Sequence, residues 1–228
     1  GKPLIEIEGL PMIEHVRRRT VLCSGFSDVV VATCDAEIQE AVEAFGGRVV
    51  TTSKEHIMAS DRVAEAAQDL DCTHVINVQG DEPFANPNDI LKVADQMENG
   101  DHREVVNGMS PITNPADFHD ETIPKVIAWD GLLKYMSRAP VPYPYGPTKE
   151  MWNRNAMQQV CIYGFFRHHL EKFWIFKKTM FEESEDIEIL RFIEMGIPVR
   201  MLELEGSPIH VDTPEDLERA QIIVKDYN

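Results

Sequence analysis

The sequence lacks several patterns that would assign it to a familiar class. Its four cysteines show no CxxC spacing, which argues against a zinc site or a disulfide framework and favours a reducing, cytoplasmic setting. No apolar run approaches the length of a membrane span, and no GxGxxG turn follows a predicted strand. Basic residues are few, and the net charge of −17 argues against nucleic acid or an anionic membrane as a partner.

The chain does contain enough apolar sequence for one sizeable core. Its 228 residues are 43% hydrophobic and 27% charged, a composition that fits one α/β domain better than two. No repeat, low-complexity tract or linker divides the sequence. We therefore predict a single domain spanning residues 1–228, with an inserted region at 110–154.

Strand and helix patterns alternate in the first part of the chain. Apolar β-branched runs predict strands, and helical spacing of apolar residues predicts the helices between them. The predicted strands lie at 28–33, 49–52 and 73–78, and the helices at 11–23, at 35–45 and from Ser60, which we expect to be the N-cap. This alternation predicts a doubly wound, mixed but mostly parallel Rossmann-like sheet.

The rest of the chain is less regular. Strands are predicted at 105–112, 160–166 and 199–205, with helices at 88–97 and 186–195. The segments 125–128 and 132–136 flank a turn and predict a hairpin, and the proline-rich segment 139–148 predicts a long loop. A last helix is expected with Thr213 as N-cap, Pro214 in the first turn and Asp216 completing a capping box.

The segment 76–83 (INVQGDEP) places two carboxylates directly after a predicted strand. Asp81 and Glu82 could present a metal ligand at the carboxyl end of the sheet, or they could be ordinary solvated turn residues. Asp212 also follows an apolar pair, Ile209 and Val211, so it could either join Asp81 at one divalent cation or simply cap the last helix. A magnesium–nucleotide complex would suit two such acidic loops.

Nine ordered segments carry a resemblance to a known family. They are GKPL (1–4), PMIEHV (11–16), VATCD (31–35), SDR (60–62), NVQGDEP (77–83), KV (125–126), YMSRAPVPY (135–143), IYGF (162–165) and VDTPEDLERA (211–220). Together they resemble the CMP-sugar synthetases of the 3-deoxy-D-manno-octulosonate (KDO) cytidylyltransferase type, over essentially the whole chain.

The resemblance implies CMP transfer from CTP to the anomeric hydroxyl of KDO, with release of pyrophosphate, for lipopolysaccharide biosynthesis. It also implies a homodimer, Mg²⁺ bound by Asp81 and Asp212, and Lys2 on the phosphates as a further catalytic residue. The implied nucleotide contacts are Lys2, Ser60, Arg62 and Gln79. The implied positions of the acceptor-sugar pocket are Gln79, Arg138, Gln159, Tyr163, Glu182 and Ile189. For Arg138, whose guanidinium suits a planar carboxylate, a salt bridge that anchors the proline-rich loop is the alternative.

The sequence departs from the family pattern at positions for both substrates, the nucleotide and the acceptor sugar. The family has a segment resembling IPARxxSxRxP before GKPL, so we expect a first strand and a phosphate-binding loop to be missing here. Ala59 stands where the family has glycine, and Gln159 and Ile189 stand where it has histidine and glutamine. The last two changes make that corner of the pocket more apolar and leave 8-amino-KDO, another ulosonic acid or a phosphonate as alternative acceptors.

Two readings from other classes also stay open. One is a dinucleotide-dependent oxidoreductase, against which the missing GxGxxG turn speaks. The other is a noncatalytic nucleotide-binding module, against which the two acidic loops speak.

Overall fold

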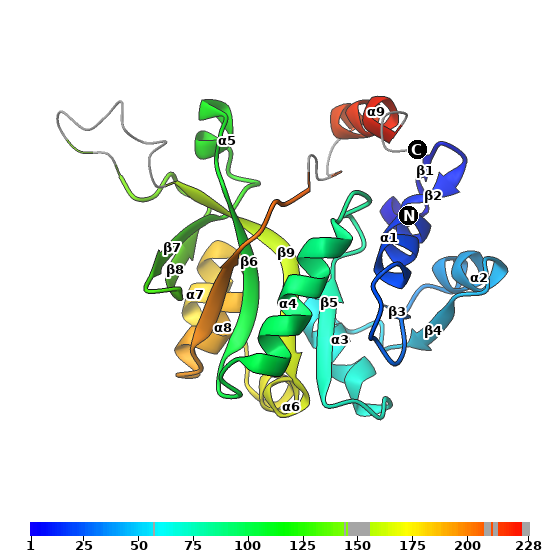
Figure 1. The fold of residues 1–228 in the computed structure, drawn as a ribbon, viewed down its shortest axis with the longest axis horizontal. Coiled ribbons are helices and arrows are strands. Elements are labelled where there is room, and N and C mark those ends of the chain that lie inside the picture. Colours follow the sequence, from blue (N-terminus) through cyan, green and yellow to red (C-terminus); the bar gives the residue numbers. More distant parts are fainter. Residues whose placement is uncertain (57, 144, 146–155, 208–210, 212–213, 225–228) are drawn as a thin grey trace.

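A mixed sheet forms the centre of the protein (Figure 1). The computed structural model describes residues 1–56, 58–143, 145, 156–207, 211 and 214–224. Across the sheet, the strands run in the order β5 (His74–Val78), β9 (Met157–Phe166), β6 (Val105–Pro111), β10 (Val199–Glu203), β8 (Leu132–Ser137) and β7 (Lys125–Trp129). The α/β class with a mixed sheet agrees with the prediction from the sequence.

The balance of parallel and antiparallel pairs differs from the expectation. Strands β6 and β10 are parallel, whereas β9 pairs antiparallel with both β5 and β6. A second parallel pair, β3 (Val30–Thr33) with β4 (Arg48–Thr51), forms its own two-stranded sheet. The local alternation of strands and helices indicated the elements, but it could not reveal that β5 pairs with a strand more than 80 residues later in the chain.

Helices cover both faces of the central sheet, and the side chains of β9 alternate between them. On one face, α4 (Pro87–Asn99) packs Val93 and Met97 against Val160 and Ile162. On the other face lie α3 (Ala59–Gln68), α6 (Arg167–Ile175), α7 (Met180–Glu185) and α8 (Ile189–Glu194). Gly164 allows the close approach of α4, because a Cβ there would lie 2.6 Å from Met97 Cγ.

The two ends of the described chain meet beside the sheet. A short helix η1 (Lys2–Leu4) precedes the hairpin of β1 (Glu6–Ile7) and β2 (Leu10–Pro11), which leads into α1 (Met12–Val21). The last helix, α9 (Pro214–Ile223), packs near β1 (Figure 1). Their shared core contains Ile7, Met12, Phe84, Val211 and Ala220. The remaining helices are α2 (Ala36–Ala44), which follows β3, and α5 (Pro115–His119).

Local turn chemistry explains which predicted boundaries hold. The hairpin β7–β8 is confirmed, and Asp130 and Gly131 adopt φ angles of 55° and 69° at its turn. The predicted helix 186–195 is wrong at its start, because Asp186 adopts a left-handed φ of 54° and ends α7, while α8 begins at Ile189. Ser60 is not the N-cap of α3; Met58 is, and Ser60 lies in the first turn.

The region 110–154, which was expected to be an insertion, is in part continuous with the main sheet. Its hairpin extends the main sheet, since β8 pairs with β10 and β7 pairs with β9. Residues 144 and 146–148 of the proline-rich loop, and Thr213 before the last helix, lie outside the described residues.

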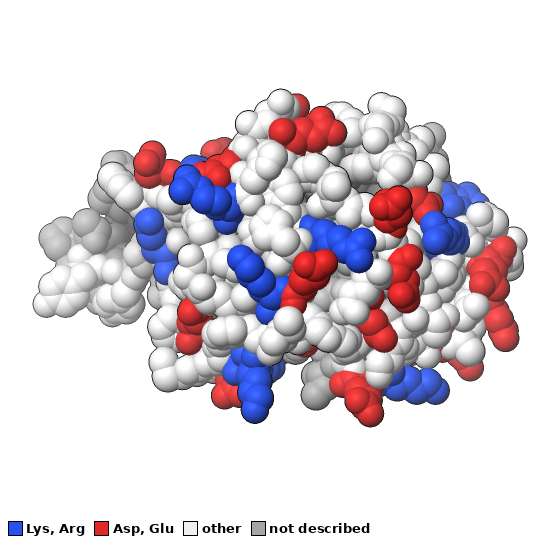
Figure 2. Space-filling view, turned by 90° about the horizontal axis from the view of Figure 1, so that it is seen from below, with Lys and Arg blue, Asp and Glu red and all other residues white. Residues whose placement is uncertain are grey.

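Surface charge and helix composition are relevant to the expectation that neither nucleic acid nor a membrane is a partner. Figure 2 shows one face on which Lys and Arg side chains are interspersed with Asp and Glu. Within the described part of the chain, no helix combines the length and the apolar character needed to cross a membrane.

Candidate active site

The Asp81 loop begins where β5 ends and carries a tight turn. The N–H of Gln79 donates to the carbonyl of Cys161 at 3.3 Å, and the N–H of Glu82 donates to the carbonyl of Gln79 at 3.2 Å. The side chain of Glu82 points inward and is 2% exposed, whereas the side chain of Asp81 is 37% exposed. The turn therefore separates the two neighbouring carboxylates, and only Asp81 is available to a ligand.

Lys2 faces Asp81 from the first helix of the chain. Its Nζ lies 3.0 Å from Oδ2 of Asp81, and its side chain is 36% exposed. The two residues are 79 positions apart in the sequence, so only the fold brings them together. The predicted phosphate-binding lysine and the predicted metal-binding aspartate thus occupy one site.

A large cleft opens beside this pair. Its volume is about 1300 Å³, and it runs between the edges of β3 and β5. Lys2, Arg62, Gln79 and Asp81 all line it, together with apolar side chains of α1 and α3. Four of the predicted catalytic and nucleotide-binding residues therefore line one cleft.

Arg62 also organises the rim of this cleft. Its guanidinium donates to Oγ1 of Thr52 at 2.5 Å and to the carbonyl of Ser53 at 3.2 Å. These bonds tie the segment after β4 to α3. Arg62 thus has a structural task in addition to the predicted nucleotide contact.

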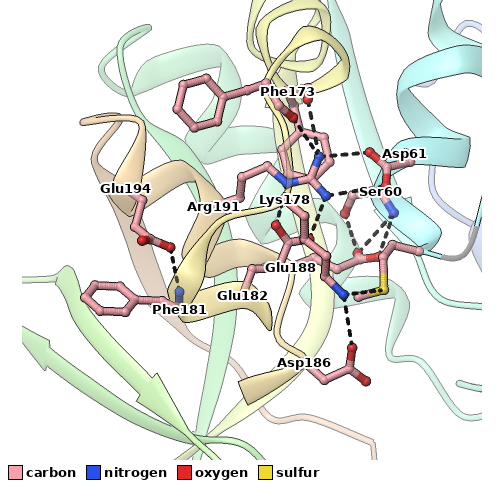
Figure 3. Close-up of polar contacts among 12 residues, drawn as sticks. Ser60, Asp61, Phe173, Lys178, Phe181, Glu182, Asp186, Glu188, Arg191 and Glu194 are labelled. Carbon is pink, nitrogen blue, oxygen red and sulfur yellow. Dashed lines mark hydrogen bonds and ion pairs between the residues drawn. The ribbon is translucent and has the colours of Figure 1, made fainter. Parts of the chain in front are cut away.

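Ser60, which was predicted as a nucleotide contact, is buried against a carboxylate. Its hydroxyl donates to Glu188 at 2.5 Å, and its backbone N–H lies 3.0 Å from the same carboxylate (Figure 3). Ser60 is 2% exposed. Burial raises the pKa of Glu188, although the hydrogen bonds from Ser60 act in the opposite direction. The carboxylate of Glu188 therefore accepts hydrogen bonds at the start of α3. Local sequence patterns do not predict this contact.

The predicted acceptor residues Gln159 and Tyr163 lie together on β9. Nε2 of Gln159 donates to Oη of Tyr163 at 3.2 Å and to Oδ1 of Asn107 at 2.9 Å. Burial, the neighbouring thiol of Cys161 and the carboxylate of Glu188 raise the pKa of Tyr163 well above its usual value. Tyr163 is therefore a neutral hydrogen-bonding group.

Cys161 joins this polar row to the Asp81 loop. Its pKa is raised well above that of an ordinary thiol, first by burial and then by the nearby carboxylates of Glu82 and Asp81. The thiol is therefore protonated at neutral pH and suited to a hydrogen bond rather than to nucleophilic attack. Neither Asn107 nor Cys161 was identified in the sequence, because their roles depend on which strands become neighbours.

Glu182 and Ile189 do not line this row. Glu182 is fully buried, and both of its oxygens lie 2.6 Å from the guanidinium of Arg191 (Figure 3). Arg191 also contacts Asp61 at 2.9 Å and lies over the ring of Phe173 at 3.7 Å. Ile189 is 2% exposed and belongs to the apolar core. In the structure, Glu182 pairs with Arg191, and Ile189 packs in the core beside the sheet.

Arg138 is held by backbone carbonyls. Its guanidinium donates to the carbonyls of Glu185 at 2.6 Å, Glu121 at 3.0 Å and Asp186 at 3.1 Å. The carboxylate of Glu185 in turn accepts the N–H of Arg138 at 2.9 Å. This geometry supports the alternative in which Arg138 anchors the segment after β8.

The second predicted metal ligand, Asp212, lies outside the described residues. Its neighbour Val211 is described, and the N–H of Val211 lies 3.5 Å from the carbonyl of Asp81. Val211 also shares a buried cluster with Phe84. Among the described residues, three or more metal-ligating side chains do not gather at any one point.

Comparison with known proteins points to one family. The family profile described as "Cytidylyltransferase" matches residues 1–201. The 3-deoxy-manno-octulosonate cytidylyltransferase of Escherichia coli is 32% identical over 98% of this chain and 89% of its own. The enzyme of the same name from Idiomarina loihiensis is 36% identical over 99% of this chain and 93% of its own.

Solved structures give the same picture. The structure of a CMP:2-keto-3-deoxy-manno-octonic acid synthetase complexed with CTP matches the whole chain with a TM-score of 0.91 at 31% identity, and the match covers 93% of that chain. A putative glucose-1-phosphate thymidylyltransferase from Bacillus anthracis matches with a TM-score of 0.71 at 14% identity, over 100% of this chain and 87% of its own, which shows a shared fold.

Proposed function

The chain belongs to the cytidylyltransferase family, and on that basis we propose that it transfers CMP from CTP to the anomeric hydroxyl of KDO. The hydroxyl oxygen forms a bond to the α-phosphorus and gives up its proton to water, the bond from that phosphorus to the bridging oxygen breaks, and pyrophosphate leaves. The product would serve lipopolysaccharide biosynthesis. The observation that carries the proposal is the Lys2–Asp81 pair at this cleft.

Each cleft residue has a task that suits its chemistry. Negative charge builds up on the phosphate oxygens during the transfer, and the ammonium of Lys2 is placed to neutralise it. Arg62 and Gln79 line the cleft where the nucleotide would lie. The transfer needs no histidine or cysteine nucleophile, because the acceptor hydroxyl attacks the phosphorus directly.

We propose Asp81 and Asp212 as the ligands of a magnesium ion. Magnesium is typically bound through one or two carboxylates together with substrate phosphates and water, so a small set of protein donors suits it. Asp81 fits this role because its carboxylate is partly exposed at the cleft. The packing of Val211 near the Asp81 loop supports Asp212 as the second ligand. When bound, the ion supplies a Lewis acid that polarises phosphate and hydroxyl oxygens.

The setting and assembly are further parts of the proposal. Four unpaired cysteines and a nucleotide substrate fit a reducing, cytoplasmic location. Trp129, Tyr143 and Tyr145 expose 78%, 70% and 83% of their surface, which supports a homodimer built through the region 110–154. Sedimentation analysis of the wild-type protein and a Trp129→Glu variant tests this; a monomer at micromolar concentration would rule the dimer out.

A pyrophosphate-release assay tests the function. CTP, magnesium and a panel of acceptors would be used: KDO, 8-amino-KDO, another ulosonic acid and a phosphonate. We expect release with KDO, and none with Asp81→Asn. Turnover with another acceptor alone would change the acceptor while keeping the reaction. No turnover with any acceptor, together with tight NAD binding, would favour a dinucleotide-binding protein.

A further inference from the structure

The segment 52–56, which follows β4, is held by Glu65 of α3. Oε2 of Glu65 accepts the N–H of Ser53 at 2.8 Å and lies 2.6 Å from Nε2 of His56. The ring of His56 also packs edge-on against Trp174, with 5.1 Å between the ring centroids. One carboxylate oxygen therefore fixes two residues of a segment that is neither helix nor strand.

The carboxyl group of Glu65 is ionised in this setting. Burial raises its pKa, but the hydrogen bonds from Ser53 and His56, together with the charges of His56 and Arg62, outweigh burial, so the pKa lies below its ordinary value of 4.5. An ionised carboxylate can only accept hydrogen bonds, so Nε2 of His56 is the donor. Glu65 thus sets the hydrogen-bonding role of the His56 ring.

The same two residues of the segment hold the guanidinium of Arg62. Nη1 of Arg62 donates to the carbonyl of Ser53 at 3.2 Å, and Nη2 donates to the carbonyl of His56 at 3.4 Å. Nη1 also donates to Oγ1 of Thr52 at 2.5 Å. Arg62 is therefore oriented by a segment that Glu65 holds in place.

The hydrogen-bond donors of Arg62 are divided between this segment and the cleft. A guanidinium has five N–H groups. Both groups on Nη1 and one on Nη2 are used by the segment 52–56, and the other two make no hydrogen bond within the described part of the chain. Arg62 lines the cleft, so the direction in which the remaining donors point there follows from the acceptors that hold the other three.

We propose that Glu65 is a positioning residue for CTP binding, because it holds, through Ser53 and His56, the carbonyls that orient the guanidinium of Arg62. This inference rests on the proposed function, through the nucleotide contact of Arg62. Glu65 does not itself line the cleft, so its effect on CTP must pass through Arg62. A small displacement of a substrate-positioning group is enough to weaken binding and slow the reaction.

Calorimetry of CTP binding with magnesium and without an acceptor gives the main test, followed by KM for CTP and for KDO. Glu65→Met removes both acceptor oxygens at similar length, so Kd and KM for CTP should rise about tenfold, whereas KM for KDO should change less than about twofold. Glu65→Gln can keep a carbonyl oxygen at the position of Oε2 and accept both hydrogen bonds. Its Kd for CTP should therefore stay within about threefold of the wild type.

The matched control is Glu194→Met. The carboxylate of Glu194 also accepts a backbone N–H, that of Phe181 at 2.9 Å, but Glu194 does not line the cleft or hold the segment 52–56. Denaturant unfolding should show a loss of stability in this variant, with Kd for CTP unchanged.

A double variant tests whether Glu65 acts through Arg62. Once Arg62→Met has removed the guanidinium, adding Glu65→Met should weaken CTP binding no further. If Glu65→Met does not fold, Thr52→Val provides the second test, because it removes one acceptor of Nη1 and keeps the shape of the side chain. Its Kd for CTP should also rise, and only while Arg62 is present.

Three results would overturn the inference. Glu65→Met, or Thr52→Val in its place, could bind CTP as the wild type does, Glu65→Gln could bind as poorly as Glu65→Met, or the loss could be equally large in the Arg62→Met background. Because calorimetry needs no acceptor, CTP binding without transfer to any acceptor would overturn the proposed function alone.

Discussion

The ammonium of Lys2 lies 3.0 Å from the carboxylate of Asp81, so the cation proposed to bind phosphate and the anion proposed to bind metal neutralise each other at the cleft. Both side chains are about one-third exposed. A pair of this kind contributes at most about 1 kcal/mol to stability. We therefore propose that the pair serves function rather than stability, with a metal–nucleotide complex replacing each partner by a ligand of the same charge.

This exchange predicts opposite effects of two substitutions on the metal requirement. Lys2→Ala removes a cation that competes for Asp81, so the magnesium concentration for half-maximal rate should stay the same or fall, while kcat/KM for CTP falls about tenfold or more. In Asp81→Asn, the magnesium concentration for half-maximal rate should rise so far that the rate no longer reaches saturation with magnesium.

Kinetic titrations of CTP and magnesium measure both effects. Lys134→Ala is the control, since Lys134 is an exposed lysine on β8 and lies away from the cleft. A higher magnesium requirement in Lys2→Ala would contradict the exchange.

Glu182→Gln should affect stability rather than acceptor binding. Glu182 and Arg191 are 0% and 3% exposed, and removing one charge from a buried pair is strongly destabilising, by about 3–5 kcal/mol. Denaturant unfolding measures this loss. KM for the acceptor, measured on folded protein, should stay unchanged.

The control for this pair is Glu171→Gln, which breaks the exposed Arg167–Glu171 pair and should cost less than about 0.5 kcal/mol. A raised acceptor KM in Glu182→Gln without loss of stability would instead support the sugar contact implied by the family resemblance.

Arg138→Lys should lower stability even though it keeps the charge. Lysine has one compact ammonium group and cannot span the carbonyls of Glu121, Glu185 and Asp186 as the guanidinium does. We expect a loss of about 1–3 kcal/mol in urea unfolding, with acceptor KM changed less than twofold. A large increase in acceptor KM with full stability would identify Arg138 as the carboxylate clamp.

The lowered pKa of His169 predicts how the free energy of unfolding depends on pH. Burial, followed by the charges of His168 and Lys172, lowers the pKa of His169 from 6.5 to about 4. Between these values the unfolded chain binds a proton that the folded protein does not, so the contribution of His169 to stability is lost as pH falls from about 6.5 to about 4. The shift corresponds to at most about 3 kcal/mol.

Unfolding free energies measured at several pH values test this dependence. His169→Phe should flatten the slope in this window, whereas His119→Phe, at an exposed histidine, should leave it intact. An unchanged slope in His169→Phe would show that other groups cause it.

Residues close in sequence were the predictable part of this protein. The turn at Asp130 and Gly131 and the loop after β5 follow from local preferences, so the hairpin and the Asp81 loop could be predicted. The helix predicted at 186–195 failed because Asp186 adopts a left-handed conformation that apolar spacing does not reveal.

Long-range partners could not be read from the sequence. Ser60 contacts Glu188 across 128 positions, and Arg191 contacts Asp61 across 130. These contacts decide whether a polar residue binds a ligand or supports the fold. The family resemblance proposed Asp81 and Lys2 as site residues, and their contact shows only that the fold brings them together. The contacts of Glu182, Arg138 and Asn107 depend on neighbours that the sequence does not reveal.

The most direct test of the central claim is ³¹P NMR of CTP, magnesium, KDO and the protein. We predict a new phosphodiester signal from the CMP-sugar, in a one-to-one ratio with pyrophosphate, and no such signal with Asp81→Asn under the same conditions. Phosphodiester formation at a near-normal rate with Asp81→Asn, or none with the wild-type protein, would contradict the account.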